Sequence, residues 1–260
     1  MIPILPLIIL IICLIGTLFI TSKYEYKFAY PNKELLVDLI VKSQAFQVPE
    51  KPVKAEHREA PLYYKIEFSQ IFEKGLQMEL SKLMANFIRT SDVTFDRLIG
   101  VGSRQKEDKP LREKYLTVPL LSAIMKKPYA LIIEIVDSKK FICEGEIKEG
   151  ETVIIIDEVL TTGKSVINAV KYLRENFKDI KIAYVFTPIV RFPFREGGID
   201  GAKRTLWDYG VELYTIIDNV ELVETLYKRK YLTSGKLQQV LKDEDLVGSP
   251  VWHLKNPSMK

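Results

Sequence analysis

Two acids and a group of hydroxyl side chains follow one another in the stretch VIIIDEVLTTGKS, which covers Val153–Ser165. An apolar run, typical of a buried strand, ends at the carboxylates of Asp157 and Glu158. Residues that suit a loop and the start of a helix come next, namely Thr161, Thr162, Gly163, Lys164 and Ser165. Ligands of open α/β sheets bind where strands end, and backbone N–H groups at the start of a helix bind phosphate. Paired acids suit ribose hydroxyls or hydrated Mg²⁺, so the stretch predicts a site for a sugar phosphate.

Two other interpretations of this stretch are open. The first is an ordinary strand, turn and helix in which one Thr or Ser caps the helix, although capping requires one hydroxyl and no paired acids. The second is a nucleotide-binding loop of the Walker type, because Gly163-Lys164-Ser165 matches the end of that motif. The Walker motif also requires a glycine five residues before Gly163, where this chain has Glu158.

Such a site requires a scaffold of strands and helices, and the hydrophobic pattern of the chain predicts one. Short apolar runs predict strands at Leu62–Phe68, Arg97–Val101, Tyr129–Val136, Val153–Ile156, Ile180–Val190 and Val211–Ile217. Apolar residues at helical spacing predict helices at Glu34–Ala45, Phe72–Ile88, Leu116–Met125, Val166–Phe177, Glu221–Lys230 and Ser234–Leu241. The alternation of strands and helices indicates an α/β fold with a doubly wound, mainly parallel sheet.

The N-terminal residues have a different composition. Ile2–Ile20 carries no charge, and its length is near the span of about 20 residues that a transmembrane helix needs. A cleaved signal peptide is the alternative, but no basic residue precedes the run and no small-residue pair makes a convincing cleavage site. Lysines and tyrosines follow at Lys23, Tyr24, Tyr26, Lys27, Tyr30 and Lys33. Positive charge on that side predicts a single-pass membrane protein whose large C-terminal part lies in the cytoplasm.

The expected domain organisation follows from these observations. We expect a transmembrane anchor over residues 1–22, a juxtamembrane linker over 23–33, one α/β domain over 34–245 and a C-terminal tail over 246–260.

Composition argues against several other classes of site. The net charge is +4 and no basic stripe with interleaved aromatic residues is present, which argues against nucleic acid as a partner. The two histidines, His57 and His253, are not part of a Cys/His cluster, so no zinc site is predicted. Cys13 lies in the apolar run far from Cys143, so the fold does not depend on a disulfide.

The pattern of Val153–Ser165 resembles the signature with which type I phosphoribosyltransferases bind 5-phosphoribosyl-1-pyrophosphate (PRPP). Within that superfamily the chain is most similar to orotate phosphoribosyltransferase, over roughly residues 34–241. The further similar segments are Ala60–Tyr64, Leu98–Val101, Thr117–Leu120, Arg195–Gly198 and Gly210–Leu213. The resemblance implies a phosphoribosyltransferase-like fold, PRPP and a nucleobase as ligands, Mg²⁺ as cofactor, and a homodimer.

The resemblance also implies how PRPP is held. Asp157 and Glu158 hold the ribose hydroxyls, act in catalysis, and face Mg²⁺ through PRPP and water. Thr161, Thr162, Gly163, Lys164 and Ser165 bind the 5-phosphate, and Gly102 and Ser103 bind PRPP where an earlier strand ends. The reaction implied is transfer of the 5-phosphoribosyl group to a base. Orotate is the best guess for that base, and the products are then orotidine 5-monophosphate and pyrophosphate.

The base-binding residues follow from the same resemblance. An arginine of the family contacts the orotate carboxylate; Arg195 is the closer match here and Arg191 is a second candidate. Lys54 is a loose counterpart of a lysine that precedes the Ala60-Pro61 element.

Two loops depart from the family pattern. A charged insertion, SRQKEDKPLREKYL, lies between Gly102 and Thr117, and its cations either bind pyrophosphate or face water. The mobile catalytic loop of the family opens with Arg-Lys, whereas the corresponding strand here ends in EIVDSKKF, from Glu134 to Phe141. Only Lys139 and Lys140 are available there as catalytic cations. Three functions are therefore open: an orotate transferase, a transferase for another base such as a purine, and a non-catalytic PRPP or nucleotide sensor at the membrane.

Overall fold

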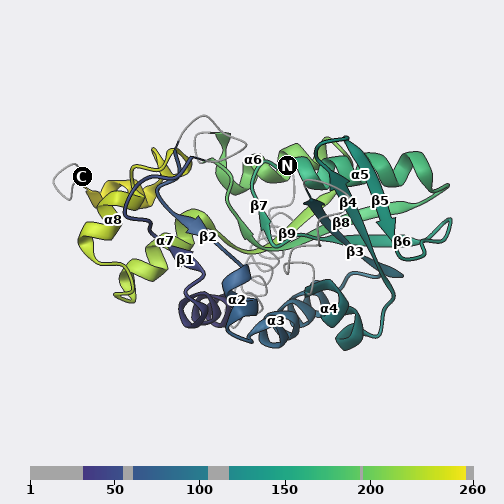
Figure 1. The fold of residues 1–260 in the computed structure, drawn as a ribbon, viewed down its shortest axis with the longest axis horizontal. Coiled ribbons are helices and arrows are strands. Elements are labelled where there is room, and N and C mark those ends of the chain that lie inside the picture. The colour runs from purple at the N-terminus through teal and green to yellow at the C-terminus, as the bar shows by residue number, and fades with distance from the viewer. Residues whose placement is uncertain (1–31, 55–60, 105–116, 194–195, 256–260) are drawn as a thin grey trace, which may run out of the picture.

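The structure is a computed structural model that describes residues 32–54, 61–104, 117–193 and 196–255. Within these residues seven strands form one sheet, with helices on both faces (Figure 1). The strands are β3 (Arg97–Arg104), β4 (Tyr129–Ile135), β5 (Lys140–Glu144), β6 (Thr152–Ile156), β7 (Val159–Leu160), β8 (Lys181–Val190) and β9 (Glu212–Asp218). Their order is β5-β4-β3-β6-β8-β9, with β7 also beside β8. The pairs are parallel except for β4 and β5, so the predicted α/β fold with a mainly parallel sheet is confirmed.

The chain reverses its winding direction between β3 and β6. From β3 it passes through α4 (Thr117–Met125) to β4 on one side. From β6 it passes through α5 (Lys164–Asn176) to β8 on the other side, and then through α6 (Gly198–Trp207) to β9. Helices α3 (Gln77–Thr90) and α4 cover one face, and α5 and α6 cover the opposite face (Figure 1). Ligands of open α/β sheets bind at the carboxyl ends of strands at such a reversal, so the ends of β3 and β6 mark the expected ligand position.

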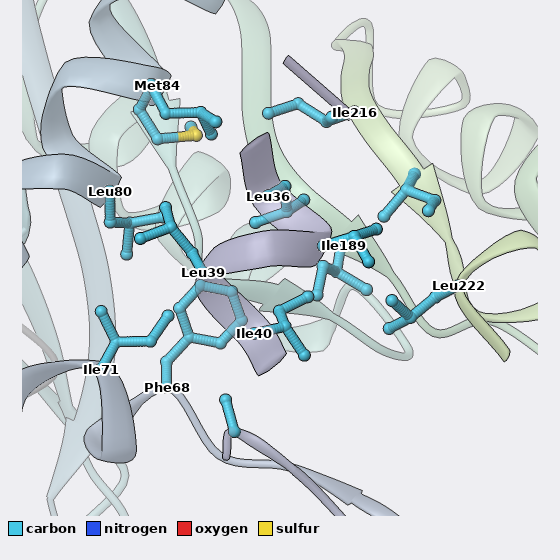
Figure 2. Close-up of a cluster of buried hydrophobic side chains, with 14 of the residues drawn as sticks. Leu36, Leu39, Ile40, Phe68, Ile71, Leu80, Met84, Ile189, Ile216 and Leu222 are labelled. Atoms are coloured by element: carbon cyan, nitrogen blue, oxygen red, sulfur yellow. The ribbon is translucent and has the colours of Figure 1, made fainter. Parts of the chain in front are cut away.

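Buried side chains form a separate apolar cluster on each face of the sheet. Successive side chains of a strand point to opposite faces, so Ile154 and Ile156 join one cluster while Val153 and Ile155 join the other. Figure 2 shows the first cluster, to which residues of α3, β8, β9, α7 and the helix of residues 32–43 contribute. Strand β6 is therefore apolar on both faces, as a central strand of a parallel sheet must be.

The segments before β3 and after β9 pack together beside the sheet (Figure 1). The first comprises the helix of residues 32–43, β1 (Phe46–Gln47), β2 (Lys65–Ile66) and α2 (Ser69–Glu73). The second comprises α7 (Asn219–Lys228), α8 (Ser234–Val240) and the 3₁₀ helices η3 (Glu244–Leu246) and η4 (Pro250–Lys255). Arg229 joins the two segments through ion pairs with Glu34 and, at 2.8 Å, with Asp38.

Several elements differ from the sequence prediction, and α6, β1 and β7 are among those that were not predicted. The single helix expected at Phe72–Ile88 is divided into α2 and α3, because Gly75 adopts a left-handed φ of 70° that ends the first helix. Strand β5 was not predicted, since five residues between two loops carry little periodic signal. The segment expected to be a tail from residue 246 is ordered in its described part, where Val251 is buried against the core.

The predicted anchor of residues 1–22 and nearly all of the linker of residues 23–33 lie outside the described residues. Among the helices that the structure does describe, none is both long enough and apolar enough to span a bilayer.

An ion pair fixes the start of β3 against the residue that precedes β6. The Nε and Nη2 atoms of Arg97 donate to the two carboxylate oxygens of Glu151 at 2.7 and 2.9 Å. These hydrogen bonds hold the pKa of Glu151 below its ordinary value. A lowered folded-state pKa contributes stability above the unfolded pKa of about 4.3 and loses it as the pH falls through the folded value.

Replacing Glu151 by Gln is therefore expected to lower the free energy of unfolding at pH 7 by about 1.5–3 kcal/mol. The difference between the variant and the parent chain should shrink below about pH 4. Urea unfolding at several pH values measures both effects. Exposed Glu149 provides the control, because its replacement by Gln should leave the stability curve unchanged. A Glu151→Gln deficit that is constant down to pH 3 would show that the ion pair is not its cause.

Candidate functional site

The acidic pair interrupts a strand without changing the register of that strand. Strand β6 pairs with β8 as far as Ile156, and β7 resumes the pairing at Val159 with the same offset. Asp157 and Glu158 occupy the interruption, and the Asp157 N–H still donates to the Phe186 carbonyl at 3.0 Å. Both acidic side chains are half-buried. The backbone is thus held in the sheet, while two carboxylates are placed at the carboxyl end of the central strand β6.

Strands β3 and β6 separate at this edge. Their pairing ends at Gly100 opposite Ile156, whereas β3 continues along β4 as far as Arg104. Gly102 is buried and Ser103 half-buried in this continuation. Both therefore lie on the β3 side of the reversal point, and Asp157 lies on the β6 side. The two halves of the predicted PRPP site meet where the sheet topology places a ligand.

The hydroxyl-rich turn leads directly into α5. Thr161, Thr162, Lys164 and Ser165 are exposed, whereas Gly163 is buried. Gly163 has a φ of 72°, in the left-handed region that side chains disfavour, and α5 begins at the next residue. The first N–H groups of a helix have no helical partner, and the dipole there favours an anion. The first turn of α5 contains no acidic residue, so the partial positive charge at the start of the helix suits a phosphate.

The start of a second helix contacts the acidic pair. Thr117, the first residue of α4, is buried, and its Oγ1 donates to Glu158 Oε1 at 3.3 Å. A carboxylate beside a helix N-terminus is stabilised by the same dipole that attracts phosphate. Glu158 is therefore held in place by a residue on the opposite side of the reversal point. This contact of the Thr117 side chain is not evident from the sequence.

The acids also fit a magnesium ion that arrives with its ligand. Mg²⁺ keeps several waters and is commonly held by one or two carboxylates together with substrate phosphates. In the part of the chain that the structure describes, His, Cys, Asp and Glu nowhere gather in a group of three that would hold a metal alone. Asp157 and Glu158 are two neighbouring carboxylates of the kind that such an arrangement requires.

Solved structures share this architecture. The chain matches orotate phosphoribosyltransferase from Aeropyrum pernix over 74% of its own length and 98% of that chain, at 18% identity and a TM-score of 0.54. The corresponding enzyme from Francisella tularensis matches 80% of this chain and 96% of its own, at 19% identity and a TM-score of 0.56. The chain has the type I phosphoribosyltransferase fold. No protein-family model matches the chain.

Curated relatives of the phosphoribosyltransferase fold match at the level of sequence. Orotate phosphoribosyltransferase of Methanocaldococcus jannaschii is 40% identical over 82 residues, which are 32% of this chain and 42% of the relative. Uridine 5'-monophosphate synthase of Caenorhabditis elegans is 25% identical over 202 residues, which are 75% of this chain and 36% of the relative. The chain therefore spans less than half the length of these two relatives.

The predicted catalytic lysines lie at a tight turn of the phosphoribosyltransferase fold. Lys139 and Lys140 are exposed, and Ile135 pairs directly with Lys140, so only four residues join β4 to β5. Strand β5 is three strands away from β6, and a spacing of about 4.8 Å per strand gives about 14 Å. That is farther than a lysine side chain reaches toward Asp157 itself. The catalytic role of Lys139 and Lys140 stays a prediction.

Of the three predicted base-binding residues, the structure describes Arg191 and Lys54. Arg195 lies outside the described residues, and Lys54 is exposed on a loop. Arg191, next after β8, is buried; its Nε donates to Asp245 at 2.8 Å and its Nη2 to Asp243 at 3.2 Å. These two acids accept hydrogen bonds from the Arg191 guanidinium and thereby attach the C-terminal segment to the sheet. Base binding by Arg191, Arg195 and Lys54 stays a prediction.

Two hollows in the described residues lie away from the reversal point. One of about 550 Å³ is lined mainly by the helix of residues 32–43, β1 and the segment between α7 and α8, including Phe46, Leu226 and Tyr231. The other, of about 320 Å³, lies between Tyr63 and α8. Neither contains a residue of the predicted PRPP site, so the acidic pair and the α5 turn, rather than a hollow, define the candidate site.

A close backbone contact shapes the turn that precedes α6. A Cβ at Gly201 would lie 2.2 Å from the Glu196 carbonyl oxygen. Replacing Gly201 by Ala is therefore expected to lower the free energy of unfolding by about 1–3 kcal/mol, because the backbone must move. Denaturant unfolding of the two chains measures the difference.

The same substitution at Gly235 in α8 is the matched control. No atom lies within 4 Å of the Cβ position there, and alanine favours helix over glycine. Gly235→Ala should raise the stability by up to about 1 kcal/mol. Equal effects at both positions would contradict the close contact at Gly201.

Proposed function

We propose that this chain binds PRPP with Mg²⁺ at the reversal point and transfers the 5-phosphoribosyl group to a nucleobase, with orotate as the first base to test. The observation that carries the proposal is the placement of Asp157 and Glu158 in an in-register interruption of the central strand, directly before an anion-suited helix start. A capped turn alone would not need two carboxylates there. The shared fold and the sequence similarity to proteins named orotate phosphoribosyltransferase support the same reaction.

Each part of the site has a task in this reaction. The N–H groups and hydroxyls of Thr161–Ser165 hold the 5-phosphate, and the carboxylates of Asp157 and Glu158 accept hydrogen bonds from the ribose hydroxyls. A base nitrogen forms a bond to C1 as the bond from C1 to the pyrophosphate oxygen breaks, and the nitrogen gives up its proton to the pyrophosphate or to water. The products are a nucleoside 5-monophosphate and pyrophosphate. The nearby carboxylates stabilise the positive charge that develops on the ribose. Bound Mg²⁺ supplies positive charge to the departing pyrophosphate.

The test is a direct assay of the full-length chain. Orotate, PRPP and Mg²⁺ are mixed with the protein, and the loss of orotate absorbance is followed together with the release of pyrophosphate. Turnover with orotate supports the proposal as stated. Turnover only with adenine or hypoxanthine supports a transferase for another base. Neither turnover nor binding of PRPP would refute the assignment of the site.

A second candidate is a PRPP or nucleotide sensor without catalytic activity. The observation that favours it is the four-residue connection of β4 and β5, which stands where the resemblance predicts a mobile catalytic loop with Arg-Lys. PRPP binding measured by calorimetry, without turnover of orotate, adenine or hypoxanthine, would support this function.

We also propose that residues 1–22 anchor the protein in a membrane, with the phosphoribosyltransferase-like domain in the cytoplasm, and that it acts as a homodimer. The apolar composition of Ile2–Ile20 and the lysines after it support the anchor. Fractionation of cells that express the full chain, and of cells that express it without residues 1–22, tests the anchor. Cross-linking of the full chain tests the dimer.

A further inference from the structure

One acidic side chain lies at the β3 side of the candidate site and has no task in the proposed reaction. Glu134 is half-buried near the end of β4, and Ser103 of β3 is its direct partner in the parallel register. Asn168 of α5 donates from Nδ2 to Glu134 Oε2 at 3.4 Å. This contact places the carboxylate on the face of the sheet that α5 covers, one strand away from the predicted PRPP-binding pair Gly102 and Ser103.

The surroundings of Glu134 hold its position. Phe141 is its direct partner on β5, and the Phe141 ring packs 5.3 Å from the ring of Tyr172 on α5. Glu134 thus lies between a hydroxyl on one neighbouring strand and an aromatic ring on the other, with an amide above it. All three groups are neutral, so none of them forms an ion pair with the Glu134 carboxylate.

We infer that Glu134 determines ligand specificity: its charge disfavours the 1-pyrophosphate of PRPP and shifts the preference of the site toward 5-phosphoribosyl ligands without that group. This inference rests on the proposed function, in which the 5-phosphate lies at α5 and the pyrophosphate extends toward Gly102 and Ser103. The 5-phosphate lies beyond the first residue of α5, one helical turn before Asn168, which contacts Glu134, whereas the pyrophosphate lies beside Ser103, the direct strand partner of Glu134. Repulsion between like charges falls with distance, so Glu134 affects the pyrophosphate more strongly than the 5-phosphate.

The experiment compares two ligands on the full-length chain. Titration calorimetry in the presence of Mg²⁺ gives the dissociation constants of PRPP and of ribose 5-phosphate for the wild type and for Glu134→Gln. The variant keeps the shape of the side chain and an oxygen that accepts from Asn168, but removes the charge. The affinity for PRPP relative to ribose 5-phosphate is expected to rise about three- to tenfold in Glu134→Gln, and further in Glu134→Lys. Glu144→Gln, at an exposed position of β5, is the control and should leave the ratio unchanged.

The outcomes separate this inference from the function on which it rests. If the wild type binds PRPP and the ratio in Glu134→Gln stays within about twofold of the wild-type value, the specificity role of Glu134 is refuted and the proposed function stands. If the wild type binds neither ligand, the proposed function fails and this inference fails with it. A ratio that rises equally in Glu144→Gln would show a general effect of net charge and would also refute a specific role.

Discussion

Replacing Asp157 by Asn is expected to reduce phosphoribosyl transfer by about 100-fold or more, the scale of effect seen when a preorganised polar group in an active site is removed. Asp157 begins the interruption between β6 and β7, and its carboxylate is expected to accept hydrogen bonds from the ribose and to face the positive charge that develops there. The fold should survive the change. The Oδ1 atom of Asp157 accepts the Glu158 N–H at 2.9 Å, and asparagine keeps an oxygen that can do the same.

Steady-state kinetics with the base that proves active measures this effect, and calorimetry with PRPP replaces the kinetics if the chain binds without turnover. Asp208→Asn, an equal change of charge at an exposed position after α6, is the control and should keep the parent rate. An Asp157→Asn variant with the parent rate and parent PRPP affinity would remove Asp157 from the site.

Replacing Arg191 by Met is expected to lower the free energy of unfolding by about 3–5 kcal/mol, because it leaves two buried carboxylates without their cation. The side chain of Asp243 is fully buried and that of Asp245 is 8% exposed. The Arg191 guanidinium also lies 4.2 Å from the centre of the Tyr64 ring, so the same change removes a contact with the segment before β3. Urea unfolding followed by circular dichroism measures the loss.

Two further variants distinguish an effect of buried charge from a loss of packing. Adding Asp243→Asn and Asp245→Asn to Arg191→Met should restore part of the lost stability, since the carboxylates are then gone. Breaking the exposed pair of Lys228 and Glu224 by Lys228→Ala should cost less than about 1 kcal/mol. If the triple variant is no more stable than Arg191→Met, the charge explanation is wrong.

The core of the candidate site could be predicted from sequence because it is local. Strand, acids, turn and the start of a helix follow one another within Val153–Ser165. Each of them can be predicted from residues that are adjacent in the sequence. The mainly parallel sheet could be predicted for the same reason, since buried strands and amphipathic helices alternate along the chain.

Contacts between distant residues could not be predicted in this way. Arg191 and Asp245 are 54 positions apart, and nothing near either residue indicates the other. The same holds for Glu134 and Asn168, and for Thr117 and Glu158, which meet only because the topology brings β3, β4, α4 and α5 to one edge. Strand β5 was missed because its stability depends on pairing with β4 and on the contact of Phe141 with Tyr172, neither of which is a property of the five residues themselves.

The unbroken register across Asp157 and Glu158 restricts how this protein can evolve. Val159 packs toward one apolar cluster and Leu160 belongs to the other. An insertion or deletion of one residue in the acidic pair would exchange these two faces, so that Leu160, now 1% accessible, would have to pack in the other cluster. Substitutions can change the chemistry at these two positions, but the pairing with β8 on both sides fixes the number of residues between β6 and β7 at two. Relatives that have lost the acids should therefore still have two residues there, with other side chains.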